Sequence, residues 1–249
     1  MTASEKVMLA VIKFKVQGNF RFLSHAETLK LFQRACVRAG INVQYSQGFN
    51  PRPRMSLPLP RSVGVESDDE LLCMRFSHET DSASGDMNAL QVGSRLSGQL
   101  PQGCELISVD FTDANVSFRP CLKTYIISVR QEYFNKKLMA KIDRLLRAKN
   151  LYIERKVVKN GTTHNIDVRS FFESIDVNNQ CIVVVCNISP AGSVRVEEIL
   201  RLLELDVEQL SAPVKRTNVQ WNKYNKITWN AGVREIKNGT RDANKCCRE

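Results

Sequence analysis

The stretch FRFLSHAETLKLFQRACVRAGINVQYSQGFNPRPRMSLPLPRSVGVE, residues 20–66, carries the strongest local structural signals in this 249-residue chain. Ser24 is followed three residues later by Glu27, which is the spacing of a capping box at a helix N-terminus. We therefore predict a helix whose first residue is His25. Apolar residues then recur every three or four positions, and Gly40 is typical of a helix end.

The middle of this stretch, YSQGFNPRPR (residues 45–54), combines aromatic, amide and guanidinium groups with two prolines. No Asp or Glu occurs between Thr28 and Val65. The prolines hold Arg52 and Arg54 in extended backbone, and paired guanidiniums suit phosphates. These features predict a rigid cationic loop that binds an anion. The alternative is a solvated proline-rich hairpin.

Individual ligand roles follow from side-chain chemistry. The residues expected to hold phosphates are Arg21, Arg52, Arg54 and Arg61. Gln47 and Asn50 are expected to read a base or a sugar, and Phe49 either stacks on a base or lies in the core. Three basic side chains spaced by four along the predicted helix would widen the cationic surface: Lys30, Arg34 and Arg38.

Hydrophobic patterning outside this stretch indicates further elements. In the first half we predict strands over 7–16, 41–45, 71–76 and 104–111, with helices over 25–40 and 89–100. In the second half we predict strands over 124–129, 151–158, 181–188 and 214–221, with helices over 134–148 and 193–205.

Both halves have the element order β-α-β-β-α-β, which is the ferredoxin-like pattern. The predicted fold class is therefore α+β, with two tandem ferredoxin-like (βαββαβ) domains built on antiparallel sheets. The domains would span residues 1–117 and 118–222, and residues 223–249 are predicted to be a polar, flexible tail.

Composition favours a polyanionic partner. The formal net charge is +10 and the pI is about 9.3, an excess typical of proteins that bind nucleic acid. The alternative is a basic protein without such a partner. The N-terminus does not resemble a signal peptide, and no window reaches the length of a membrane span. We expect no membrane association, a cytoplasmic location and free thiols.

The eight cysteines do not predict a metal site. Cys181 and Cys186 lie in one predicted strand at a spacing that puts their thiols on opposite faces. CxxC pairs, the C-x-x-x-C-x-x-C iron–sulfur triplet and glycine-rich nucleotide loops are all absent from the sequence. We therefore expect no metal and no cofactor.

Two further sites have a chemical and a structural interpretation. His25 at a helix start, with Tyr45 and the nearby arginines, is a candidate for metal-independent cleavage of RNA; alternatively it only packs or caps. Asp167 and Arg169 in the second half either form a surface ion pair or complete a cleft between the domains.

Three motifs carry a family resemblance: RFLSH (21–25), YSQGFNPRPRMS (45–56) and VGVES (63–67). They resemble the signature of the radical-SAM-linked protein family, a domain found alone or fused to the C-terminus of cobalamin-binding-type radical S-adenosylmethionine (SAM) proteins. The resemblance spans most of residues 8–220. In the second half IDVR (166–169) is similar to the family's I-D-[LIV]-R-P, with Ser170 in place of the proline.

The resemblance implies association with a radical SAM enzyme and RNA-related work. Because the iron–sulfur triplet is missing, we expect a partner of that enzyme: an RNA-binding or substrate-presenting accessory protein in tRNA or rRNA modification. One alternative is a metal-independent endoribonuclease that uses His25, by architectural analogy with the CRISPR repeat-processing endoribonucleases. Another is a protein-interaction adaptor with a basic docking face.

Overall fold

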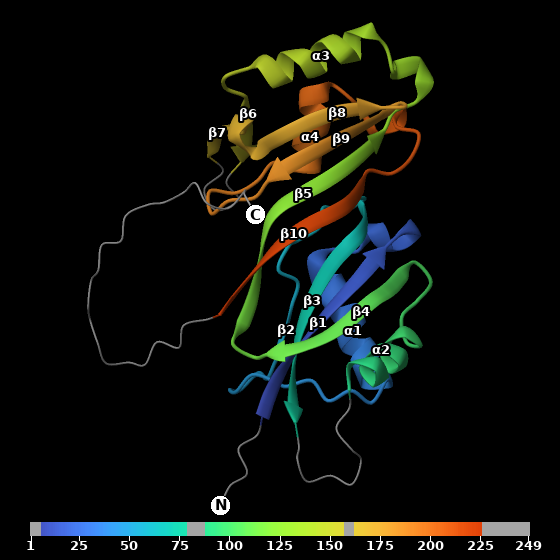
Figure 1. Cartoon of the computed structure of the whole chain (residues 1–249), viewed down its shortest axis with the longest axis vertical. Helices are drawn as coiled ribbons and strands as arrows, with labels where there is room; N and C mark the ends of the chain where they lie inside the picture. Colours follow the sequence, from blue (N-terminus) through green and yellow to red (C-terminus); the bar gives the residue numbers. More distant parts are fainter. Residues whose placement is uncertain (1–5, 79–87, 157–161, 226–249) are drawn as a thin grey trace, which may run out of the picture.

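The structure is a computed structural model that describes residues 6–78, 88–156 and 162–225 (Figure 1). The strands are β1 (Lys6–Val16), β2 (Met55–Ser56), β3 (Glu66–His78), β4 (Cys104–Asp113), β5 (Val116–Ser128), β6 (Tyr152–Lys156), β7 (Thr163–Asp167), β8 (Phe172–Asn178), β9 (Cys181–Asn187) and β10 (Lys215–Asn225). The α-helices are α1 (His25–Arg38), α2 (Ala89–Ser97), α3 (Lys136–Arg147) and α4 (Val196–Leu203). Short 3₁₀ turns are Gly18–Phe22, Gln131–Tyr133, Arg169–Phe171 and Val207–Gln209.

Most strands belong to one large sheet. Its order is β4-β1-β3-β10-β5-β9-β8, and β2 pairs with β3 beside that path. Every pairing in it is antiparallel except that of β3 with β10. A mixed fold with a mostly antiparallel sheet is thus confirmed. Where the sequence predicts two antiparallel sheets, the structure joins the strands of both halves into one.

The first half packs α1 and α2 against one face of β1 and β3. Its core contains Phe14 and Phe32, whose rings meet edge-on at 4.6 Å, together with Leu72 and Leu96. The predicted start of α1 is confirmed, because Ser24 accepts from the Glu27 amide while Glu27 accepts from the Ser24 amide. This half contributes the strand order β4-β1-β3-β2.

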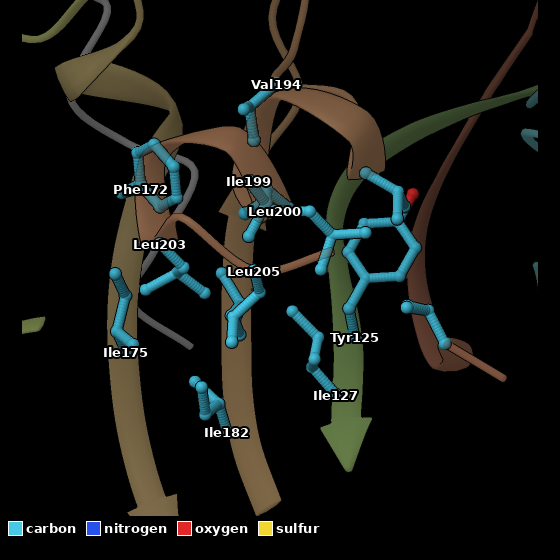
Figure 2. Close-up of a cluster of buried hydrophobic side chains, with 14 of the residues drawn as sticks. Tyr125, Ile127, Phe172, Ile175, Ile182, Val194, Ile199, Leu200, Leu203 and Leu205 are labelled. Carbon is cyan, nitrogen blue, oxygen red and sulfur yellow. The ribbon is translucent and has the colours of Figure 1, made fainter. Parts of the chain in front are cut away.

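The second half contributes the order β10-β5-β9-β8 and carries α3 and α4. Figure 2 shows side chains of β5, β8 and β9 meeting those of α4, including Ile127, Ile182 and Leu203. The β6–β7 hairpin forms a separate sheet. Arg155 of β6 ties this hairpin to α4 through two 2.7 Å hydrogen bonds to Glu198.

The two halves meet where β3 and β10 pair in parallel, at Glu66 with Lys215 and Ser67 with Arg216. Beyond this junction β5 and β10 continue side by side toward the half that carries α1 and α2 (Figure 1). Their ends pack on the face of the first half opposite its helices. The apolar cluster formed there contains Leu9, Leu71, Cys73, Val116, Phe118 and Trp221.

Several predicted elements differ from those observed. The strand predicted over 41–45 is reduced to two isolated bridges, and the sheet is joined instead by the short β2. The strand predicted over 151–158 is β6, outside the main sheet, whereas β8 takes the sheet position beside β9. Of the predicted tail, residues 223–225 belong to β10 and residues 226–249 lie outside the described part of the chain.

Candidate nucleic-acid interface

Residues 44–54 form a hairpin, which we call the arginine hairpin. Its arms are held by hydrogen bonds from the Ser46 amide to the Arg52 carbonyl at 2.8 Å and from the Arg54 amide to the Gln44 carbonyl at 2.7 Å. Arg75 of β3 fixes the base, since its carbonyl accepts from Gln44 at 2.8 Å and its amide donates to Arg54 at 3.0 Å. The hairpin backbone is therefore bonded to the sheet at one end and free to project at the other.

The tip of the arginine hairpin faces solvent. The Phe49 side chain is fully exposed, so it does not lie in the core. Gln47, Asn50 and Arg52 are exposed as well. Gly48 has φ +126°, a conformation that L side chains rarely adopt, and this glycine lets the tip turn sharply.

Arg52 and Arg54 lie on the same face of the hairpin. The 44–54 and 46–52 hydrogen bonds set a regular antiparallel register, in which alternate residues share a face. The Cα atoms of two such residues are separated by about 6–7 Å. Within residues 6–78, 88–156 and 162–225, neither guanidinium has a carboxylate within 4 Å. Both positive charges remain available to an external anion.

A hollow of about 850 Å³ lies between α1 and the arginine hairpin. We call it the helix cavity, and its lining includes Arg34, Arg38, Tyr45 and Pro53. The guanidinium of Arg38 already has a partner within the protein, because it donates to the Gln99 carbonyl at 2.7 Å. Lys30, the third basic residue expected to widen the cationic surface, is exposed on α1 but does not line the helix cavity.

A second hollow of about 380 Å³ lies on the sheet side of the hairpin. We call it the ribbon cavity, because the ends of β5 and β10 form one wall. Its polar lining consists of Arg54, Ser56, Arg75, Ser117 and Tyr224. Neither hollow has Asp or Glu among the described residues that line it. The sequence motifs do not reveal Arg75, Ser117 or Tyr224, which come from strands remote from the hairpin in sequence.

Arg61 and Arg21 lie in the segment that leads into α1. The Arg61 side chain is 6% exposed and 3.8 Å from Glu70. Its guanidinium donates to the carbonyls of Phe20, Arg21, Leu23 and Val65. Arg21 donates to Gly18 and lies over the Phe22 ring at 4.3 Å. These contacts fix the backbone of the segment that precedes α1. Phosphate binding by Arg61 or Arg21 stays a prediction.

The structure separates His25 from Tyr45. His25 is the first residue of α1, whereas Tyr45 lines the helix cavity with the C-terminal half of that helix. The nearest α1 residue of that lining is Gln33, which lies about 12 Å from His25 along the helix axis. Cleavage of RNA by His25 with Tyr45 requires both side chains at one phosphate and stays a prediction.

Asp167 and Arg169 organise the chain locally. Asp167 accepts from the amides of Leu151 and Arg169 and from Asn150. These bonds, led by the one from Leu151, lower the pKa of Asp167. Arg169 donates to the carbonyls of Leu146, Ala148 and Phe172 and so holds the C-terminal end of α3. Their predicted place in a cleft between domains stays a prediction.

Cys36, Cys104, Cys181 and Cys186 do not form disulfides. Burial raises the pKa of Cys36, Cys104 and Cys186 to about 12, so these three side chains are inert core residues. Within the described ranges, three or more His, Cys, Asp or Glu side chains do not gather in a metal-binding group. In the same ranges, no helix is both long and apolar enough to cross a membrane.

Fold and site together define a helix-and-sheet protein with an exposed basic hairpin beside a large, mostly antiparallel sheet. The family model described as "uncharacterized protein conserved in bacteria" (DUF2344) matches residues 10–202. The chain belongs to the DUF2344 family. This match includes the arginine hairpin and most of both halves of the sheet. No curated protein matches the sequence.

Proposed function

We propose that this protein binds RNA through the arginine hairpin and presents it to a radical SAM enzyme in the cytoplasm, as an accessory protein in tRNA or rRNA modification. The observation that carries the proposal is the hairpin itself. Two guanidiniums without carboxylate partners in the described chain share one face, beside a fully exposed phenylalanine.

Each part of the hairpin has a task in binding a flexible polyanion. Guanidiniums form strong charge-assisted hydrogen bonds with phosphate oxygens. Stacking of a base on an exposed ring such as Phe49 contributes about 1–3 kcal/mol and tolerates any sequence. The hydrogen bonds to Arg75 hold the hairpin base in place, which lowers the entropy lost on binding.

The proposal of a radical SAM enzyme as partner rests on the motif resemblance. YSQGFNPRPRMS, the longest of the three motifs, coincides with the arginine hairpin and β2. An accessory role fits a chain whose candidate site offers anion contacts and stacking. We also propose that the two halves are tandem ferredoxin-like units. Support comes from the strand orders β4-β1-β3-β2 and β10-β5-β9-β8, because each follows the same 4-1-3-2 arrangement of its own four strands.

Salt-dependent binding tests the proposal. Filter binding of total tRNA and of rRNA fragments is measured between about 50 and 300 mM KCl, because counterion release makes the affinity fall with salt. Arg52→Ala with Arg54→Ala removes two phosphate contacts. It should weaken binding about 10-fold or more and reduce the log–log salt slope by about 1.4, the value for two contacts to a single strand.

The matched control removes the same charge elsewhere. Arg95 and Arg201 are exposed residues of α2 and α4, away from the hairpin. Arg95→Ala with Arg201→Ala should leave the affinity within about 2-fold of wild type if contacts, rather than net charge, decide binding. Equal losses in the two double variants, or an affinity for RNA that does not depend on salt, would overturn the proposal.

A further inference from the structure

The ribbon cavity lies directly beside the arginine hairpin and shares Arg54 with it. Its volume of about 380 Å³ falls within the range of small-ligand pockets, about 300–1,000 Å³. Leu9, Cys73 and Val116 contribute an apolar part of the lining. A hollow of this size admits one nucleotide unit and excludes a base-paired duplex.

Two arginines stand side by side in this cavity. β2 and β3 pair Met55 with Met74 and Ser56 with Cys73, and the same register places Arg54 opposite Arg75. The 3.0 Å hydrogen bond from the Arg75 amide to the Arg54 carbonyl agrees with that placement. Like charges directly opposite each other across a sheet repel. An anion bound between them would relieve this repulsion, and the described lining contains no Asp or Glu that does so.

The opposite wall offers a different chemistry. Ser117 of β5 and Tyr224 of β10 are register partners, and both line the cavity with Phe118. The guanidinium of Arg119 lies over the Tyr224 ring at 4.5 Å. Phe118 packs on the apolar cluster that contains Leu9 and Cys73 and so faces the strands that carry the arginine pair, whereas Ser117 and Tyr224 lie on the other face of β5 and β10. Aromatic rings stack on bases, and hydroxyls bond to a sugar or phosphate.

From these two walls we infer that the ribbon cavity is a subsite for one unpaired, phosphorylated nucleotide of the bound RNA. The phosphate lies between Arg54 and Arg75, and the base lies against Phe118. This inference rests on the proposed function, because the nucleotide belongs to the RNA held by the arginine hairpin. It adds the substrate class: RNA with a terminal or unstacked nucleotide rather than a continuous duplex.

Calorimetry with AMP, adenosine and inorganic phosphate tests the subsite apart from RNA binding. AMP should bind wild-type protein at least 10-fold more tightly than either adenosine or phosphate, because only AMP uses both walls. Phosphate binding as tightly as AMP would reduce the cavity to a plain anion site and overturn the inference. Adenosine binding as tightly as AMP would remove the role of the arginine pair.

Variants separate the two walls. Arg75→Ala should weaken AMP binding at least 10-fold. If Arg75→Ala is unstable, Arg75→Gln replaces it, because glutamine retains a donor for the Ala114 carbonyl, which Arg75 contacts at 3.2 Å. Arg75→Gln should weaken AMP binding by a similar factor. Phe118→Leu should weaken binding of AMP but not of phosphate. Arg201→Ala, at an exposed residue of α4 that lines neither cavity, should change neither affinity. AMP affinity unchanged in both Arg75 variants would contradict the assignment.

The two proposals fail in distinguishable ways. If the protein binds RNA through Arg52 and Arg54 but does not bind AMP, the nucleotide subsite is wrong and the proposed function stands. If AMP binds in the predicted manner while RNA does not bind at any salt, the subsite stands as a nucleotide pocket and RNA presentation is wrong.

Discussion

Lys123 is an ammonium group inside the core of the second half. It is 5% exposed, and its Nζ donates to the Val194 carbonyl at 2.8 Å and to the Ser193 hydroxyl at 3.1 Å. Burial lowers the pKa of Lys123 from its ordinary 10.5 to about 8, although the nearby Cys186 acts in the opposite direction. The folded state therefore releases this proton at a lower pH than the unfolded state.

Removing Lys123 should change how stability depends on pH. Between about pH 8 and pH 10.5 the unfolded state binds more protons at this residue, so its contribution to stability rises with pH. Across that window the gain is on the order of 3 kcal/mol. Buried thiols with a raised pKa act in the opposite direction in both proteins, so the prediction concerns the difference between them. In guanidinium chloride unfolding, the unfolding free energy of wild type minus that of Lys123→Met should rise between these pH values. Parallel pH curves for the two proteins would contradict the lowered pKa.

Phe49 should matter for binding and not for folding. Its ring is fully exposed, so Phe49→Ala should leave the melting temperature unchanged. The same substitution should weaken binding of single-stranded RNA by about 1–3 kcal/mol through loss of base stacking. Fluorescence anisotropy with a labelled oligoribonucleotide measures this. Leu90→Ala, at another largely exposed apolar residue, is the control and should not affect binding.

At the scale of elements, the start of α1 depends on its capping box. Ser24 accepts from the Glu27 amide at 3.3 Å, and Glu27 accepts from the Ser24 amide at 2.8 Å. Ser24→Ala should destabilise the protein by about 1 kcal/mol, whereas Ser24→Gly should cost only a few tenths. Thermal unfolding monitored by circular dichroism compares the two. Equal stability of wild type and Ser24→Ala would show that the box does not hold the helix start.

Elements with a clean local pattern could be predicted from the sequence. The capping box located the first residue of α1, apolar alternation located β1, and a continuous apolar run located β9. β3 begins before the predicted residue 71, because its first residues are acidic. Asp69 and Glu70 are buried and paired, Asp69 with Lys13 at 3.6 Å and Glu70 with Arg61 and the distant Arg216. Such partners leave no local signal.

The candidate site could be predicted only in part, because some of its residues come from strands that are distant in sequence. The composition of residues 45–54 indicated an exposed cationic loop, and the hairpin has that character. Arg75 sits opposite Arg54 only through the pairing of β2 with β3. Tyr224 lines the ribbon cavity only because β10 stays paired with β5 beyond the two residues at which it pairs with β3. These positions depend on long-range strand pairing, which local patterns do not encode.

At the scale of the whole molecule, a buried charge cluster holds the two halves together. Glu70 of β3 lies between Arg61, at 3.8 Å, and Arg216 of β10, to which it is hydrogen bonded. All three side chains are at most 6% exposed. The Nε of Arg216 is also 3.4 Å from the Ser67 hydroxyl. The only parallel pairing of the described sheet coincides with this cluster, so the cluster stabilises the junction.

Neutralising Glu70 should be costly. Glu70→Gln leaves two buried guanidiniums without their carboxylate, and loss of one partner from a buried ion pair costs about 3–5 kcal/mol. The control is Asp68→Asn. Asp68 lies 3.6 Å from Lys215 with both side chains about a third exposed, and such pairs contribute about 1 kcal/mol or less. Chemical denaturation measures both. Similar losses in the two variants would show that the cluster does not hold the junction.

For the whole molecule, we propose that RNA contacts the arginine hairpin. Ultraviolet crosslinking of the wild-type protein to single-stranded RNA, followed by mass spectrometry of the crosslinked peptides, locates the contact most directly. We expect the main crosslinks within residues 44–54, centred on Phe49, and we expect them to disappear in Arg52→Ala with Arg54→Ala. Crosslinks confined to other parts of the chain, or unchanged in that double variant, would contradict the proposal.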